Sequence, residues 1–421
     1  MGTPARARKS HILAVLALTN LVAYAVRNAL VTVYPDLHAR FGLDDAQFGL
    51  LQSLFILPHA LATLPFGWAG DRYDRRYVIM VGMVLASAAG AAGALGHSFW
   101  GLAASRACVG LGTAAVVPVA NSILAEIFDG PRKASRMSLF NLGLFLGGVV
   151  GLATGTWLGF PGVVVVLAAP GLVLAVWILG LSVPRHAAPL PSVGWWRYLA
   201  DLVALFAAES RELLAIRTLR WVMLSSTTMS FAAGGYAAWL KEFLTRDKGM
   251  SDNEALTLLG FTLVGGLAGI LVGGRISDRL RRRWINGRLW TIALGMSLTI
   301  PCAVLSIELP NGASLYAIGV ATVFFMSWYH APMAASVDDL APPGKSVAAQ
   351  GLVIFTMHML GTAPASWLIG EISQRSTLRL AMWVPTFMLG VAAIAMMVAT
   401  RSFAADHARA RPAGAPPGGP L

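Results

Sequence analysis

The chain has 421 residues, of which 56% are hydrophobic and only 12% are charged, and its formal net charge is +12 at pH 7. Soluble domains usually carry about 25% charged residues. A chain of this length with so few charges cannot form a surface that faces water on all sides, so a soluble globular protein is excluded. The positive balance does not indicate nucleic acid, because Lys and Arg stand in short clusters between long apolar runs. The composition therefore predicts a polytopic membrane protein.

Twelve apolar segments are long enough to cross a bilayer as helices, which takes about 20 residues each. Barrel strands are excluded because they alternate polar and apolar residues, whereas these runs are uniformly apolar. The first run is too long for a signal peptide and has no small-residue cleavage site, so it is predicted to be a span. The predicted spans are 11–34, 46–69, 77–96, 100–127, 136–158, 161–183, 219–244, 254–276, 287–307, 313–337, 346–370 and 378–401.

The spans divide six and six around a longer segment. This pattern predicts an N-terminal bundle over 1–183, a linker over 184–217, a C-terminal bundle over 218–403 and a disordered tail over 404–421. Aromatic and leucine residues of the linker are spaced for one face of an amphipathic helix at the membrane surface. Most of the 32 Lys and Arg residues fall on the side that holds both ends of the chain, which predicts cytoplasmic termini.

Two equivalent loops follow the second and the eighth span. Both place glycine, then Asp-Arg, then further arginines at the end of a helix. The first loop has Gly70-Asp71-Arg72, and the second has Gly273-Gly274 followed by Asp278-Arg279. Such repetition indicates two parallel halves, as in many secondary transporters. The glycines allow close helix packing, and the aspartate can accept hydrogen bonds from a neighbouring helix or from the arginines. We predict a breakable conformational latch composed of Gly67, Gly70, Asp71, Arg72, Arg75, Arg76, Asp278 and Arg279.

The loop Gly67 to Arg76 resembles the signature loop of the major facilitator superfamily, G-x-x-x-D-R-x-x-R-R, and Arg106 to Gly112 resembles its second motif, R-x-x-x-G-x-G. The first 130 residues are similar to the Spinster branch, the sphingolipid and lysophospholipid transporters, in 50–57, in 70–77 and in Phe99-Trp100. The resemblance implies an all-α membrane fold of twelve transmembrane helices in two pseudo-symmetric six-helix halves. It also implies transport by alternating access.

This chain departs from the branch pattern at two positions. The branch has Tyr-x-Asp-Arg in its first span, where this chain has Tyr24-Ala25-Val26-Arg27, and a Glu where this chain has Thr113. Both carboxylates that the resemblance would assign to proton coupling are therefore absent, while both arginines remain. His358 and Glu242 are the candidate proton sites in their place.

Arg27 and Arg106 are charges inside predicted spans, roughly 10 Å below the same membrane surface. Without an acid nearby in sequence, they predict a cationic site for a phosphate or a carboxylate. The alternative for Arg106 is a bond to backbone carbonyls of an adjacent helix, and the alternative for His358 is a core histidine. The residues predicted to contact substrate are Arg27, Asn20, Tyr24, Asn28, Arg106, Thr113, Tyr236, Trp328, Tyr329 and His358.

The sequence has no Ser-His-Asp arrangement, Walker loop or metal-ligand spacing, so we predict no enzyme activity, no catalytic residue, no cofactor and no metal. We expect a secondary active or facilitative transporter of an amphipathic anion, such as a lysophospholipid or a sphingoid phosphate. A bacterial inner membrane, a monomer, lipid neighbours and no nucleic-acid partner are expected. Two alternatives stay open: a proton-coupled transporter of small organic anions, and a receptor or sensor that transports nothing.

Overall fold

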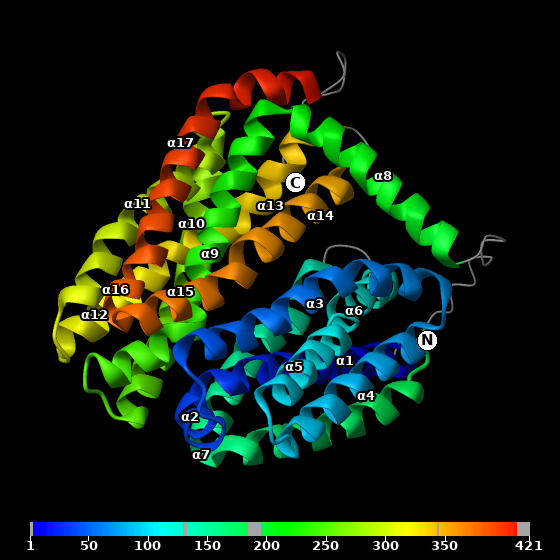
Figure 1. Cartoon of the computed structure of the whole chain (residues 1–421). Coiled ribbons are helices and arrows are strands. Elements are labelled where there is room, and N and C mark those ends of the chain that lie inside the picture. Colours follow the sequence, from blue (N-terminus) through cyan, green and yellow to red (C-terminus); the bar gives the residue numbers. More distant parts are fainter. Residues whose placement is uncertain (1–2, 129–132, 184–194, 343–344, 411–421) are drawn as a thin grey trace. The chain divides into compact units, whose positions relative to one another are not determined.

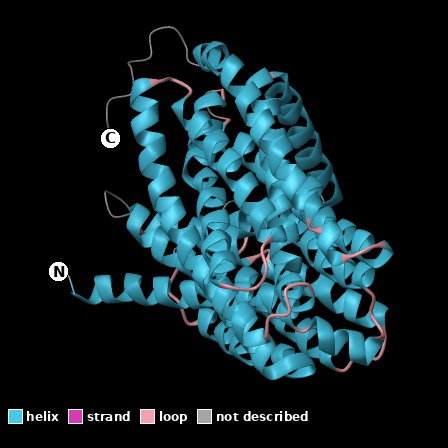
Figure 2. Ribbon diagram, turned by 90° about the vertical axis from the view of Figure 1, so that its left-hand side faces the viewer, coloured by secondary structure: helices cyan, strands magenta, loops and turns pink. Residues whose placement is uncertain are grey.

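A computed structural model describes residues 3–128, 133–183, 195–342 and 345–410, and the regular structure in these ranges is entirely helical (Figures 1 and 2). Helices follow the apolar runs because each backbone polar group in a bilayer must be satisfied within its own segment. Eight of the described segments are long and apolar enough to cross a membrane by length and composition. The chain is an all-α, multi-pass integral membrane protein.

The predicted spans of the first half all correspond to helices. The fourth predicted span consists of two successive helices, and the fifth and sixth lie in one long helix with non-helical backbone at Gly159 and Phe160. That break coincides with the predicted boundary between the two spans. The elements are α1 (Thr3–Ala29), η1 (Leu30–Thr32), α2 (Tyr34–Phe41), α3 (Asp45–Arg72), α4 (Arg75–Ala94), α5 (Phe99–Thr113), α6 (Val116–Ile127) and α7 (Lys133–Leu179).

The second half contains one helix in the linker and interrupted spans. The predicted span 313–337 is broken by a 3-10 turn, and 346–370 by a π-helical turn of the kind often found at functional sites. The elements are α8 (Trp195–Ala215), α9 (Arg217–Arg246), α10 (Asp252–Arg283), α11 (Gly287–Glu308), α12 (Ala313–Met326), η3 (Ser327–Tyr329), α13 (His330–Leu340), α14 (Ser346–Thr356), η4 (Met357–Thr362), α15 (Ala363–Arg375), α16 (Leu378–Ala381) and α17 (Trp383–Ala410).

The last helix continues beyond the predicted end of the bundle at residue 403. Asp406 Oδ2 accepts hydrogen bonds from the Thr218 backbone N (2.8 Å) and Oγ1 (2.7 Å), which ties the end of α17 to the start of α9. The predicted tail is therefore helical up to Ala410, and the rest of it, 411–421, lies outside the described residues.

The chain divides by contacts into two compact units. The first comprises 1–190, 237–247 and 366–378, and the second comprises 191–236, 248–365 and 379–421. The first unit thus includes short pieces of α9 and α15 from the second half of the sequence. The division into two six-helix bundles stays a prediction.

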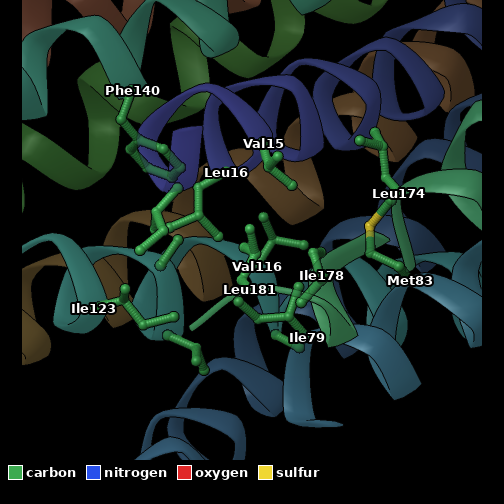
Figure 3. Packing of buried hydrophobic residues seen from close by; sticks show 14 of the residues in the cluster. Val15, Leu16, Ile79, Met83, Val116, Ile123, Phe140, Leu174, Ile178 and Leu181 are labelled. Carbon is green, nitrogen blue, oxygen red and sulfur yellow. The ribbon is translucent and has the colours of Figure 1, made fainter. Parts of the chain in front are cut away.

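The core of the first unit lies among α1, α4, α6 and α7. Figure 3 shows this packing, in which Leu16 of α1, Ile79 of α4, Val116 of α6 and Ile178 of α7 are almost fully buried. Lipid chains are as apolar as these side chains, so close van der Waals packing rather than escape from water holds the helices together.

Close packing is most marked where α7 crosses α1. Four glycines spaced four residues apart on α7 lie against the α1 backbone, and a Cβ on Gly147 or Gly151 would overlap the carbonyl oxygen of Leu21 or Ala25. The remaining two are Gly143 and Gly155. Small residues at this spacing let two helix backbones approach closely.

Gly147→Ala should destabilise the first unit by about 1–3 kcal/mol, because the added methyl group would overlap the Leu21 carbonyl oxygen, and backbone within a helix cannot shift without moving its neighbours. Gly148→Ala is the matched control, since a Cβ there meets only Asn28 Nδ2, at 3.8 Å. Thermal unfolding of the two purified variants measures the difference. Equal melting temperatures would show that the α1–α7 contact tolerates an added methyl group.

Candidate functional site

Arg106 of α5 is buried, with 2% of its surface exposed. Its guanidinium donates long hydrogen bonds to the backbone oxygens of Val26 (3.5 Å) and Arg27 (3.4 Å) on α1. A third bond, of 3.4 Å, goes to Gln52 Oε1 on α3, and the guanidinium carbon lies 4.7 Å from the centroid of the Phe55 ring. Arg106 therefore bonds to backbone carbonyls of an adjacent helix, which was the alternative to substrate contact in the sequence-based prediction.

Arg27 of α1 shares the same aromatic ring but is only half-buried. Its guanidinium carbon lies 5.8 Å from the centroids of both Phe55 and Tyr24, which is within cation–π range. Within the described ranges, neither Arg27 nor Arg106 lies at ion-pair distance from a carboxylate. Both guanidinium groups therefore contact the Phe55 ring. Backbone carbonyls and the Gln52 amide also bond to Arg106, and no carboxylate of the described residues pairs with either arginine.

A small cavity lies beside Arg106, between α1, α4, α5 and α7. Apolar side chains such as Leu30, Leu102 and Leu167 line it, and its volume of about 20 Å³ is about that of one water probe. No organic substrate fits there. Of the two arginines, Arg27 is the one exposed enough to reach a ligand, while Arg106 holds α1, α3 and α5 together and adds its charge.

His59, near the middle of α3, belongs to the same group of residues and is not among the residues predicted from sequence to contact substrate. Its Nδ1 lies 3.1 Å from Thr113 Oγ1 and 3.2 Å from the Gly110 carbonyl oxygen on α5. Its ring stacks on Phe55, with the two centroids 5.7 Å apart. An ionisable residue inside a span was the signal that could have found it.

Two of the predicted contact residues on α1 bond to backbone instead. Asn20 Nδ2 donates to the Phe140 carbonyl oxygen on α7 (3.0 Å), and Asn28 Nδ2 donates to the Tyr24 carbonyl oxygen one turn earlier (2.8 Å). Asn20 is buried, so its bond links α1 to α7. Of the predicted face on α1, the structure brings Arg27 to the ring of Phe55, and Tyr24 lies beside the same guanidinium group.

The predicted contact residues of the second half lie in the second unit. The Tyr236 hydroxyl is 2.7 Å from Thr386 Oγ1, which joins α9 to α17. Trp328 in η3 is buried, next to Tyr329, whose ring centroid lies 4.0 Å from that of His330. His358 lies in the π-helical turn η4. Their part in substrate binding stays a prediction.

A second polar cluster surrounds Asp45, the first residue of α3, ahead of the predicted span. Its carboxylate accepts hydrogen bonds from both terminal nitrogens of Arg246 (2.8 and 3.1 Å) and from the hydroxyls of Tyr34 and Ser373. Burial acts to raise the pKa of Asp45, but the bonds from Arg246, Ser373 and Tyr34 outweigh it and hold the pKa below its ordinary value. The cluster ties the start of α3 to the ends of α9 and α15.

Glu242 and its neighbour Lys241 are both buried, with 2% of each side chain exposed, and Lys241 Nζ lies 3.7 Å from Glu242 Oε1. They lie in the part of α9 that packs in the first unit. A role for Glu242 in carrying protons stays a prediction.

The loop after α3 holds its arginines by local contacts. Arg75 Nε donates to the Gly70 carbonyl oxygen (3.1 Å) and Arg76 forms an ion pair with Asp74. Arg76 also donates to the carbonyl oxygens of Leu179 and Leu181 (3.1 Å each), at the end of α7. The side chains of Asp71 and Arg72, and Gly67 with them, lie outside the described side chains, so the latch itself stays a prediction.

In the corresponding loop after α10, the described residues that form ion pairs are not the predicted Asp278 and Arg279. Asp278 and Arg279 are exposed, whereas Arg281 lies 3.8 Å from a carboxylate oxygen of Asp339, which also pairs with Arg288. The acidic partner in this half therefore comes from α13. The sequence repeat could not show this because the partner is distant in the chain.

Comparisons with known proteins agree with this fold. The chain matches the Major Facilitator Superfamily over residues 16–366. It is 30% identical to protein spinster homolog 3 of Danio rerio over 394 residues, 87% of this chain and 77% of that protein. It is 26% identical to the sphingosine-1-phosphate transporter SPNS2 of Xenopus tropicalis over 398 residues, 88% of this chain and 75% of that protein.

Among solved structures, the chain resembles a bacterial homologue of the human lysosomal transporter Spinster, crystallised in an inward-facing and unoccupied conformation. The TM-score is 0.81 at 20% identity, and the match covers 99% of this chain and 100% of that one. This likeness shows the fold, and the sequence relatives show the family. The chain is a transporter rather than an enzyme, and it belongs to the Spinster-like members of the major facilitator superfamily.

Proposed function

We propose that the protein moves an amphipathic anion, a lysophospholipid or a sphingoid phosphate, across the membrane by alternating access. The observation that carries this proposal is the pair of arginines at Phe55, which has no carboxylate at ion-pair distance within the described ranges. A charge inside a membrane protein is costly unless it is paired or used. An anionic headgroup would supply the missing negative charge.

The chemistry of the pair favours a phosphate group. A guanidinium presents a planar fork of donors that matches phosphate or carboxylate oxygens. Arg27 lies beside the rings of Tyr24 and Phe55, forms no ion pair with a described carboxylate and is only half-buried. The same rings offer apolar surface beside the headgroup. The name of the Xenopus relative, a sphingosine-1-phosphate transporter, points to the same class of substrate.

We further propose that both termini are cytoplasmic, that the protein is a monomer and that it resides in a bacterial inner membrane. The excess of Lys and Arg on the side of the termini supports the orientation. On this orientation the Asp45 cluster lies at the outer end of the first unit, and the loop of Arg75 and Arg76 lies at its inner end.

Flux of labelled lysophosphatidylglycerol into proteoliposomes tests the proposal. This lipid is a phosphodiester with one apolar chain and a single negative charge across neutral pH. We expect uptake above that of protein-free liposomes, and much less uptake of lysophosphatidylcholine, whose added cation would face the arginines. The same assay with an imposed pH gradient reports proton coupling.

Other outcomes separate the alternatives. Absence of lysolipid flux together with gradient-driven uptake of a small carboxylate would replace the proposal with a transporter of small organic anions. Saturable lysolipid binding without any flux would indicate a receptor on a transporter fold. Equal flux of the anionic and the zwitterionic lysolipid would remove the arginine pair from headgroup recognition.

A further inference from the structure

A histidine, His59, lies close to the arginine pair, and its charge can change near neutral pH. His59 stacks on the Phe55 ring that also contacts both guanidinium groups. Histidine is the side chain that ordinarily changes charge between pH 5 and 8, whereas arginine stays charged. The site therefore contains two fixed cations and one variable cation around a single aromatic ring.

We propose that His59 is the titrating residue of this anion site and that its protonation strengthens the binding of an anionic headgroup. The inference rests on the proposed function, because it concerns the same site and the same class of ligand. The residue that couples pH to substrate binding would then lie on α3, away from the candidate proton sites His358 and Glu242.

The contacts of His59 fix which nitrogen carries the hydrogen in the neutral ring. The single hydroxyl hydrogen of Thr113 has the carbonyl oxygens of Val109 (3.0 Å) and Gly110 (3.1 Å) as acceptors on its own helix, which leaves the lone pairs of Oγ1 for His59. The Gly110 carbonyl is likewise an acceptor. Nδ1, which faces both oxygens, is therefore the N–H donor, and a second proton must add at Nε2. Protonation then changes the charge of the ring without breaking its bonds to α5.

The charges on the helices around His59 determine the sign of the coupling. Among the described side chains, α5 contributes Arg106 and α1 contributes Arg27, both cations. Among the described side chains, the other charged groups of the elements that pack on α3 have partners elsewhere. Arg75 and Arg76 of α4 bond at the loop. The buried Lys241 and Glu242 of α9, a helix that packs on α3 through Trp239, pair with each other, and Glu371 of α15 pairs with Arg375. Asp45, at the start of α3 itself, is engaged by Arg246.

Protonation of His59 in the empty site therefore places a third positive charge beside two others, which is unfavourable. A bound anion reverses this balance, because it attracts all three cations. By linkage the effect is reciprocal: the anion promotes proton uptake by His59, and the proton promotes binding of the anion to the same extent. A proton and an anion would then enter the site together.

The experiment measures binding of lysophosphatidylglycerol to the purified full-length protein in nanodiscs between pH 5.5 and 8.5. This phosphodiester keeps one negative charge over the whole range, so the ligand itself contributes no pH dependence. We expect the affinity of the wild-type protein to fall about tenfold from the lowest to the highest pH, a typical coupling between two sites. The lipid should also drive proton uptake, measured with an indicator dye in weak buffer.

His59→Asn is the test variant, since an asparagine amide keeps a donor towards Gly110 and Thr113 and carries no titrating group. Its affinity should change less than twofold over the same range, and its proton uptake should vanish. His97→Asn is the matched control, because His97 is exposed in the loop between α4 and α5. It should behave as the wild-type protein does.

Each outcome decides the question. A wild-type affinity that does not change with pH, or a His59→Asn variant with the same pH dependence as the wild type, overturns the assignment while the proposed function stands. Loss of the pH dependence in His358→Asn but not in His59→Asn would move the titrating group to η4 and also overturns it. Absence of lysolipid binding at every pH would remove the proposed function, and this inference with it.

Discussion

Replacement of Arg27 by alanine should reduce flux of an anionic lysolipid at least tenfold, while the protein still folds and purifies as a monodisperse species. Arg27 is half-buried, its guanidinium lies beside the rings of Tyr24 and Phe55, and it contributes no described side-chain hydrogen bond that links two helices. Its removal therefore leaves the packing almost intact. A hydrogen bond to a charged group is worth about 1.5–3 kcal/mol, which corresponds to roughly tenfold to hundredfold in affinity.

Arg106→Ala is the informative contrast to Arg27→Ala. Because Arg106 is buried and bonds two α1 carbonyls and Gln52, its loss should lower the melting temperature as well as the flux. Arg27→Lys should retain part of the flux, since the charge remains but the planar fork is lost. Flux of Arg27→Ala equal to that of the wild type would remove this residue from the binding site.

Asp45→Asn should lower the free energy of unfolding by about 1–3 kcal/mol at neutral pH, because the attraction between two opposite charges is lost and an amide NH₂ group, which cannot accept from Arg246, replaces one carboxylate oxygen. The carboxylate is 5% exposed while Arg246 is 40% exposed, so solvent screens the pair in part and the full cost of a buried ion pair is not expected. Glu308→Gln is the matched control: its pair with Arg379 is about half-exposed on both sides and should contribute little.

The stability difference between the wild-type protein and Asp45→Asn should depend on pH, which gives a second test. The folded-state pKa of Asp45 lies below its ordinary value of 3.8, so its stabilising effect is fully present above 3.8 and is lost as the pH falls through the lower folded value. The wild-type protein should therefore keep its advantage over Asp45→Asn from pH 8 to about pH 5. As the pH falls below about 4, the two melting temperatures should begin to converge.

Melting temperatures measured across this range by intrinsic fluorescence check both statements. Tyr34→Phe refines the result, since it removes one hydroxyl donor to Asp45 and leaves the ring packed on Phe48. It should cost less than Asp45→Asn. A wild-type advantage that is the same at pH 3.5 and pH 7 would contradict the ion-pair explanation.

The sequence by itself determined the class of protein and the positions of its helices. Apolar runs of bilayer length allow only helices, so every predicted span corresponds to helical structure, within a few residues at most ends. The loop motifs and the two intramembrane arginines were sufficient to indicate the superfamily and an anionic substrate. These features are local, and a span or a motif can be recognised without knowing its neighbours.

Only the tertiary structure decided which polar residues meet. Asn20 shares a helix face with Arg27 but bonds to the α7 backbone, whereas His59, one of several polar residues in its span, lies against Thr113 and Phe55. Asp45 and Arg246 are 201 residues apart in sequence. A helical period gives the face of a residue but not which helix that face meets. The partners of buried polar groups therefore depend on packing between distant segments, which no single stretch of sequence encodes.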